Sequence, residues 1–174
     1  RILSSGSRTN PWMQESSNKI IQSGEIVSFD TDMVGPYGYC ADISRTFVEG
    51  NKFNAEQKNL YLMAVDQISH NSRLIKPGMS FKEFTTKSWK LPEKYYGNRY
   101  SVMVHGIGLC DEWPAIRYPT DGGERSGFFY KNMTITVESY IGKVGGKEGV
   151  KLEQQYLIGE NGLELMSHHQ LEDI

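Results

Sequence analysis

The first clear alternation of apolar and polar residues leads to Asp30 and Asp32, and a spacing of two is typical of a β-strand. The same spacing places these two aspartates on one face of the strand. Residues 35–38, Gly-Pro-Tyr-Gly, follow with Pro and Gly at positions that favour a hairpin turn. A turn centred between the Pro and the Tyr places Asp42 opposite Thr31. We therefore expect Asp42 to return beside both aspartates.

A change to helical spacing follows the hairpin. Residues 54–57, Asn-Ala-Glu-Gln, form a capping box, and the sequence after them predicts a helix that ends near residues 76–78, Lys-Pro-Gly. Residues 80–83 form a second capping box, which opens a helix that Pro92 is expected to stop. The apolar positions that define the first helix are Leu60, Ala64, Val65 and Ile68.

A second hairpin is predicted from alternating strands at residues 133–141 and 150–158, with a glycine-rich loop between them. Centring that hairpin on Gly145 and Gly146 places Glu138 opposite Glu153, with Cβ atoms roughly 5 Å apart. Directly opposed glutamates destabilise a hairpin unless they share a cation.

Three further strands complete the expected sheet. Residues 1–6 read as an opening strand, and a short last strand runs to Met166. Between them an apolar strand ends at His105, where Gly106 and Gly108 leave room for a close approach to the backbone. A histidine at a strand end is more often structural than a ligand, so His105 gains its significance from the nearby carboxylates.

The composition limits the possible functions. The 174 residues suffice for one domain, and a net charge of −2 with interspersed signs gives no basic stripe for nucleic acid. No apolar run approaches the roughly 20 residues of a membrane span. Cys40 and Cys110 are too few for a disulfide framework, so we expect a cytoplasmic protein. The chain begins inside a predicted strand. We therefore expect residues 1–174 to be the C-terminal catalytic portion of a longer protein, without its N-terminal domain and the start of the catalytic domain.

Carboxylates gathered in this way repel one another unless a cation neutralises them. Two hairpins that each carry carboxylates, with one imidazole between them, favour hard or borderline divalent ions such as Mn, Fe, Co or Zn. Cys40 shares the parity of Asp42, but we interpret it as a small packing residue, because a thiolate would shift the preference toward soft metals.

The set of motifs resembles the superfamily of pita-bread metallopeptidases and creatinases, from Ser5-Gly6 to the Gly-Val-Lys-Leu-Glu run that ends at Glu153. The resemblance implies an α+β fold, with a curved antiparallel sheet flanked by helices, and a homodimer. It also implies two bound divalent metal ions, with iron as the first choice. The ligands that it implies are Asp30 or Asp32, Asp42, His105, Glu138 and Glu153.

Three departures from the peptidase pattern change the expected chemistry. Asp32 stands where peptidases of the superfamily usually have Gly, and Trp12 and Asp111 stand where they usually have histidines that contact the peptide. The departures resemble one branch, the dimethylsulfoniopropionate lyases of the DddP type. That resemblance implies a base at Asp111 and a substrate-site aromatic at Tyr100. It also implies metal ligands at Asp30, Asp32, Asp42, His105, Glu138 and Glu153.

The sequence therefore predicts a metal-dependent carbon–sulfur lyase that cleaves dimethylsulfoniopropionate to dimethyl sulfide and acrylate by base-promoted β-elimination. Its substrate, a small sulfonium carboxylate, is expected to prefer aromatic faces such as Tyr100, Trp113 and Trp12. Two alternatives remain open. One is an Xaa-Pro aminopeptidase or creatinase-like hydrolase with a dinuclear metal centre, and the other is a metal-free pita-bread binding module.

Overall fold

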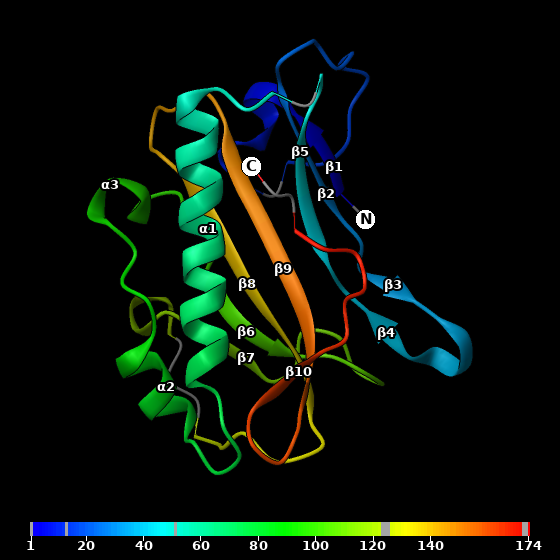
Figure 1. The fold of residues 1–174 in the computed structure, drawn as a ribbon, viewed down its shortest axis with the longest axis vertical. Helices are drawn as coiled ribbons and strands as arrows, with labels where there is room; N and C mark the ends of the chain where they lie inside the picture. The colour runs from blue at the N-terminus through cyan, green and yellow to red at the C-terminus, as the bar shows by residue number, and fades with distance from the viewer. Residues whose placement is uncertain (1, 13, 51, 123–125, 172–173) are drawn as a thin grey trace.

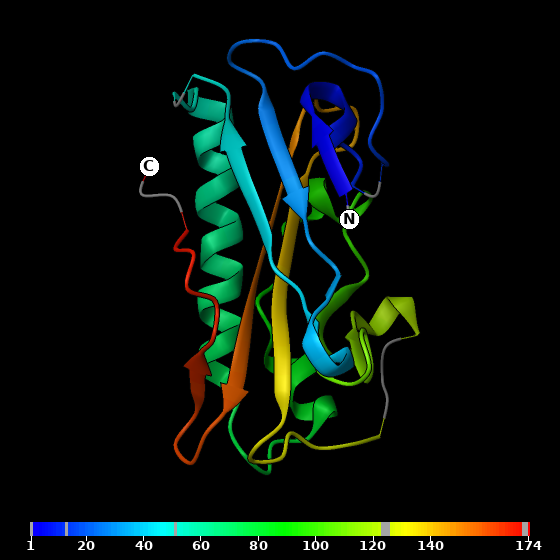
Figure 2. The same ribbon diagram turned by 90° about the vertical axis from the view of Figure 1, so that its right-hand side faces the viewer.

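The computed structural model describes residues 2–12, 14–50, 52–122, 126–171 and 174. A five-stranded antiparallel sheet with the order β10-β9-β8-β6-β7 forms its centre, and a smaller sheet with the order β1-β2-β5 lies beside β9. Figures 1 and 2 show the long helix α1 packed along β8 and β9. The strands of the large sheet are β6 (Val102–Gly106), β7 (Ala115–Arg117), β8 (Thr134–Gly142), β9 (Gly149–Ile158) and β10 (Leu163–Leu165).

The remaining elements surround this centre. The predicted opening strand is β1, although Arg1 lies outside the described residues. A two-stranded hairpin of β3 and β4 projects from the body in Figure 1. The bounds are β1 (Ile2–Ser5), β2 (Ile26–Asp30), β3 (Met33–Val34), β4 (Cys40–Ala41), β5 (Ser44–Val48), α1 (Ala55–Leu74), α2 (Phe81–Lys87) and α3 (Glu93–Tyr96).

The helix α1 forms where the capping box predicts it. The side chain of Asn54 accepts a hydrogen bond from the backbone N–H of Gln57, and the side chain of Gln57 accepts one from the backbone N–H of Asn54. The helix then buries one apolar face against the sheet, which removes that face from water and stabilises the packing. The buried positions include Leu60, Tyr61, Ala64 and Ile68. In the described parts of the chain, no helix combines the length and the apolar character that crossing a membrane requires.

The predicted stop at Pro92 is wrong. The helix α2 begins after Ser80, whose side chain accepts a hydrogen bond from the N–H of Glu83, but it ends at Lys87. Pro92 instead precedes the short helix α3. This placement suits proline, because a helix start leaves its first N–H groups without partners in any case.

The two hairpins differ in how well their registers were predicted. In the β8–β9 pair Glu138 lies opposite Glu153, as the glycine-rich loop predicts. In the first hairpin Met33 pairs with Ala41 and Asp30 pairs with Ser44, so the register is one residue away from the prediction. The turn is a short 3₁₀ segment centred on Tyr37, which has a φ of 62°.

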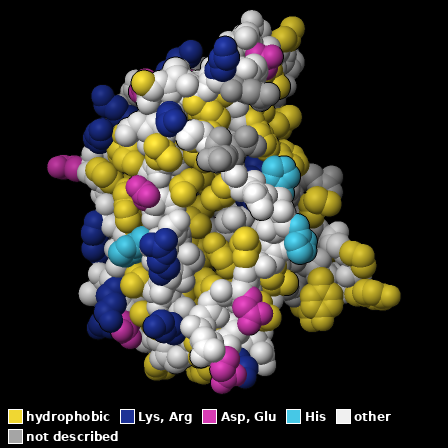
Figure 3. All heavy atoms as spheres, in the orientation of Figure 1, with side chains coloured by type: hydrophobic (Ala, Val, Ile, Leu, Met, Phe, Trp, Pro, Cys, Tyr) yellow, Lys and Arg dark blue, Asp and Glu magenta, His cyan; other side chains and the backbone are white. Residues whose placement is uncertain are grey.

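The alternation after β2 is also broken. Asp30 is buried, but Asp32 is exposed and has a φ of 37°. A positive φ turns the backbone out of the strand, so Asp32 lies beyond the end of β2 and outside its regular alternation. The tip of the hairpin carries exposed apolar side chains that stand out in Figure 3. They are Met33, Val34, Tyr37 and Tyr39.

Candidate metal centre

Five predicted ligands meet where the two sheets come together. Asp30 ends β2, Asp42 lies between β4 and β5, His105 lies on β6, and Glu138 and Glu153 are cross-strand neighbours on β8 and β9. All five side chains are buried, with exposed fractions between 1% and 6%. Residues far apart in the sequence therefore form one enclosed polar cluster.

Each potential ligand atom in the cluster lies close to several others. The Nε2 atom of His105 is 3.1 Å from Oε1 of Glu153 and 3.8 Å from carboxylate oxygens of both Asp42 and Glu138. Within the triads His105–Glu138–Glu153 and Asp30–Asp42–Glu153, one ligand atom from each residue lies within 4.8 Å of the others. Glu153 belongs to both of these triads.

The donor set fits divalent metal ions. The Oε1 atom of Glu138 is buried and, among the described residues, accepts no hydrogen bond. A buried carboxylate oxygen without a partner is costly, and a cation would satisfy it. Oxygen donors with one imidazole suit Mn, Fe, Co or Zn better than soft ions. The described residues thus include groups that could hold metal.

Crowding and burial shift the acid–base properties of these groups. Burial and the nearby Glu153 raise the pKa of Asp42 to about 9, and burial raises the pKa of Glu138 to about 7 against the opposing effect of Lys151. Burial acts to lower the pKa of His105, but the hydrogen bond with Glu153 and the charge of Glu138 outweigh it and raise that pKa to about 10. Without metal, protons therefore stay on the side chains of Asp42 and His105, and a metal ion would displace them on binding.

Lys151 is a buried cation at the centre of the cluster that the sequence analysis did not assign. Its Nζ donates to Oε2 of Glu138 at 2.6 Å and to Oε2 of Glu153 at 3.3 Å, and its side chain is 2% exposed. The same Nζ lies 4.9 Å from the ring centroid of Tyr100 and 5.7 Å from that of Trp12. Lys151 precedes Glu153 by two residues, and this spacing along a strand was the available sign that both face the site.

Ser44 and Arg45 also support the cluster and were not predicted. The Ser44 hydroxyl lies within hydrogen-bond distance of both Asp30, at 2.6 Å, and Glu153, at 2.9 Å. Arg45 is 3% exposed and donates to the backbone carbonyl of Glu153 at 2.6 Å. Both residues lie in the sequence that follows Asp42, where nothing local distinguishes them from ordinary strand residues.

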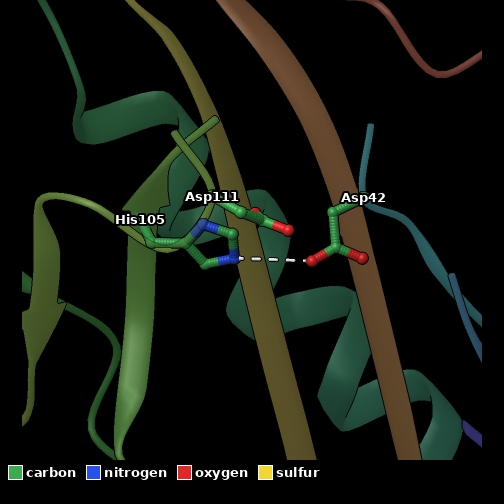
Figure 4. A group of neighbouring side chains, drawn as sticks. All are labelled: Asp42, His105 and Asp111. Atoms are coloured by element: carbon green, nitrogen blue, oxygen red, sulfur yellow. Dashed lines mark ion pairs between the residues drawn. The ribbon is translucent and has the colours of Figure 1, made fainter. Parts of the chain in front are cut away.

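Asp111 approaches the cluster from the loop after β6. Figure 4 shows Asp42, His105 and Asp111 pointing toward one another, and ligand atoms of these three residues lie within 4.8 Å. Asp111 is half-buried, and burial raises its pKa although the charge of His105 acts in the opposite direction. A Cβ on Gly106 would lie 2.1 Å from the carbonyl oxygen of Trp113, so only glycine lets this loop approach so closely.

The other predicted site residues differ in how far their side chains are exposed to solvent. Asp32 lies outside the three groups, although its backbone N–H donates to Asp42, and its role as a ligand stays a prediction. Trp12 is buried and packs against Tyr140 with ring centroids 6.1 Å apart. Tyr100 is half-buried, and Trp113 is 56% exposed. The substrate roles of Trp12, Tyr100 and Trp113 also stay predictions.

Comparison with known proteins identifies a family that matches most of the chain. The model of metallopeptidase family M24 matches residues 1–160. Dimethylsulfoniopropionate lyase DddP of Roseovarius nubinhibens is 41% identical over 97% of this chain, and DddP of Roseobacter denitrificans is 40% identical over 97%. The chain spans 39% and 38% of those two proteins.

A solved prolidase from Pyrococcus furiosus has the same fold, with a TM-score of 0.81 and 27% identity over 97% of this chain and 49% of the prolidase. The pita-bread α+β fold expected from the sequence is therefore confirmed.

Proposed function

Because this chain belongs to metallopeptidase family M24, a family of enzymes, we propose that it is the catalytic portion of a metal-dependent dimethylsulfoniopropionate lyase. The observation that carries the proposal is the placement of Asp111 beside Asp42 and His105. A carboxylate at this position accepts a proton, which β-elimination requires. The relatives named DddP, at 41% and 40% identity, support the same choice of substrate.

We propose that the site binds two divalent metal ions, with iron as the first choice. The groups proposed to bind them are the buried carboxylates and the imidazole of the cluster, together with Asp32. Bound ions would supply Lewis-acid stabilisation of the negative charge that develops on the substrate carboxylate. Lys151 and Ser44 hold Glu138 and Glu153 in place through the hydrogen bonds described above. The proposed ligands are Asp30, Asp32, Asp42, His105, Glu138 and Glu153.

Asp111 then acts as the base. It removes a proton from the carbon next to the substrate carboxylate, and the electron pair of that C–H bond forms the C=C bond of acrylate. The C–S bond breaks at the same time, and its electron pair leaves with dimethyl sulfide. Burial raises the pKa of Asp111, which moves this carboxylate toward the range that suits a base at neutral pH.

Recognition of the sulfonium depends on aromatic faces. We propose that Trp12 and Tyr100, which already contact the Lys151 ammonium, shape the inner wall of the site. Trp113 is more exposed and follows Asp111 by two residues, so it is the proposed face for the sulfonium. A contact of this kind contributes about 0.5–2 kcal/mol.

The experiment compares full-length protein with its Asp111→Asn variant, both loaded with iron. Dimethyl sulfide released from dimethylsulfoniopropionate is measured by gas chromatography. We expect the variant to lose about 100- to 10,000-fold in kcat, the usual contribution of a positioned base, and Asp66→Asn, an exposed change on α1, to have no effect. Loaded wild-type protein that releases no dimethyl sulfide would refute the lyase.

The fold shared with a prolidase supports a second candidate, an Xaa-Pro aminopeptidase or creatinase-like hydrolase. Hydrolysis of X-Pro dipeptides that survives Asp111→Asn would favour it. A metal-free binding module is the third candidate, and stoichiometric metal that is lost in Glu153→Ala would exclude it. We also propose a cytoplasmic homodimer, which light scattering on the full-length protein tests for its oligomeric state.

A further inference from the structure

Arg45 is a buried arginine that contacts the backbone of a proposed ligand instead of its carboxylate. Its Nη1 donates to the carbonyl of Ser44 at 2.8 Å and to the carbonyl of Glu153 at 2.6 Å. Its Nη2 donates to Oε1 of Gln154 at 2.6 Å and to the carbonyl of His169. One guanidinium therefore joins β5, β9 and the segment that follows β10.

A buried guanidinium with these partners contributes little to the free energy of folding. Arg45 is only 3% exposed, and among the described residues its Nε has no hydrogen-bond partner and its guanidinium forms no ion pair with a carboxylate. Removing a guanidinium from water costs several kcal/mol, and carbonyl groups recover only part of that cost. A buried apolar side chain would stabilise the same position at less cost. The arginine thus calls for a role that depends on its fixed geometry.

The contact with Glu153 suggests that role. Glu153 belongs to two of the three groups that could hold an ion, so a small shift of its backbone displaces a candidate ligand in both. Ser44 precedes Arg45 and contacts the Glu153 carboxylate through its hydroxyl. Neighbouring residues of β5 thus hold Glu153 at both ends, at the carbonyl and at the carboxylate.

Residues 166–169, which follow β10, are also connected to the cluster by hydrogen bonds through Gln155. The N–H of Gln155 donates to Oγ of Ser167 at 2.8 Å, and the N–H of Met166 donates to the carbonyl of Gln155 at 2.9 Å. The side chain of Gln155 accepts from the N–H of Asp42 at 3.3 Å. Figure 1 shows this segment running back alongside β9 on the side of β5. Residues 166–169 are thereby connected to two proposed ligands, Glu153 and Asp42.

We propose that Arg45 is a positioning residue that fixes Glu153 for both metal sites, and that it couples docking of residues 166–169 to metal affinity. The proposal rests on the proposed metal centre. It does not depend on whether the substrate is a sulfonium carboxylate or a peptide.

The test measures Co²⁺ binding to full-length protein by titration calorimetry, together with the visible absorption spectrum of bound Co²⁺, which reports its coordination. Arg45→Met removes the guanidinium and keeps an unbranched side chain, and Arg45→Lys keeps the charge. Arg73→Met, an exposed arginine in the last turn of α1, is the matched control. Circular dichroism checks that each variant keeps its secondary structure.

We expect Arg45→Met to bind Co²⁺ about 10- to 100-fold more weakly, the range seen when groups that orient metal ligands are removed. Its Co²⁺ spectrum should change, Arg45→Lys should recover part of the affinity, and Arg73→Met should match wild type. Wild-type affinity and spectrum in Arg45→Met would overturn the proposal. Wild-type protein that binds no Co²⁺ would refute the metal centre and this inference with it, whereas lack of dimethyl sulfide release alone would refute only the lyase.

A second variant covers the case in which Arg45→Met does not fold. Ser167→Ala removes the hydroxyl that accepts from Gln155 and leaves Arg45 and all proposed ligands unchanged. We expect faster hydrogen exchange in residues 166–169 and a weaker affinity for Co²⁺, with a smaller loss than in Arg45→Met. Faster exchange with unchanged affinity would show that the segment and the metal centre are not coupled, contrary to the proposal.

Discussion

Replacing Lys151 with Met tests whether the buried ammonium is required to hold the cluster together without metal. Lys151 donates to both Glu138 and Glu153, and all three side chains are at most 2% exposed. Removing one partner from a buried ion pair leaves uncompensated charge and costs about 3–5 kcal/mol. In a unit of about 150–250 residues each kcal/mol lowers Tm by about 2–4 °C, so the unfolding transition of the catalytic portion should lie about 6–20 °C lower in the metal-free variant than in wild type.

The assay is calorimetry of the full-length protein with chelator and with saturating metal. Metal should reduce the difference between Lys151→Met and wild type, because bound ions satisfy the carboxylates that the ammonium leaves. The control is Lys131→Met, since the Lys131–Glu160 ion pair is exposed and contributes at most about 1 kcal/mol. A metal-free Lys151→Met variant that melts with the control would show that the described contacts do not hold the cluster.

Four further predictions concern metal affinity, stability against pH, a close backbone approach and a helix cap. The pKa values of about 9 for Asp42 and about 7 for Glu138 mean that metal binding displaces protons. The affinity for metal should therefore fall as the pH falls from about 8 to 6. Calorimetry in buffers of different ionisation enthalpy measures both the affinity and the protons released. These raised pKa values also mean that the metal-free folded state binds more protons than the unfolded state. Its stability should therefore fall as pH rises over that window, and a Tm that rises with pH would contradict the assignment. Gly106→Ala places a Cβ against the Trp113 carbonyl and should cost about 1–3 kcal/mol of stability in chemical denaturation. Asn54→Ala removes the α1 cap and should cost about 1 kcal/mol in the same assay, with metal affinity unchanged.

Local rules predicted the parts of the fold that local contacts determine. The cap at Asn54 satisfies N–H groups within one turn, and the symmetric glycine-rich loop fixes Glu138 opposite Glu153. The first hairpin differs because Tyr37 adopts a φ of 62°, which lengthens the turn and shifts the register by one residue. The sequence rule for Pro-containing turns assumes two central residues, and here the centre is a single residue.

Some residues of the candidate site could likewise be predicted from the sequence, and others could not. Four of the five clustered candidate ligands are carboxylates, and the sequence points to them because carboxylates with strand spacing are rarely buried without a partner. His105 was predicted only from its position between them. Arg45 could not be found, because a long cationic side chain in a strand usually faces solvent. The same expectation hid Lys151, although its spacing of two residues from Glu153 places both side chains on one face of β9. Only the packing of β5 against β9 shows that both are enclosed.

Lyase and peptidase place different demands on the residues around the metal. Hydrolysis of a peptide passes through a tetrahedral oxyanion and needs a group that returns a proton to the leaving amine. The resemblance to the superfamily implies histidines for this purpose, whereas Trp12 carries an indole N–H that donates a hydrogen bond but does not serve as an acid or a base at neutral pH. Asp111, when ionised, only accepts. β-Elimination needs one proton acceptor and no returned proton, a demand that Asp111 can meet without either histidine, and this supports our proposal of elimination over hydrolysis.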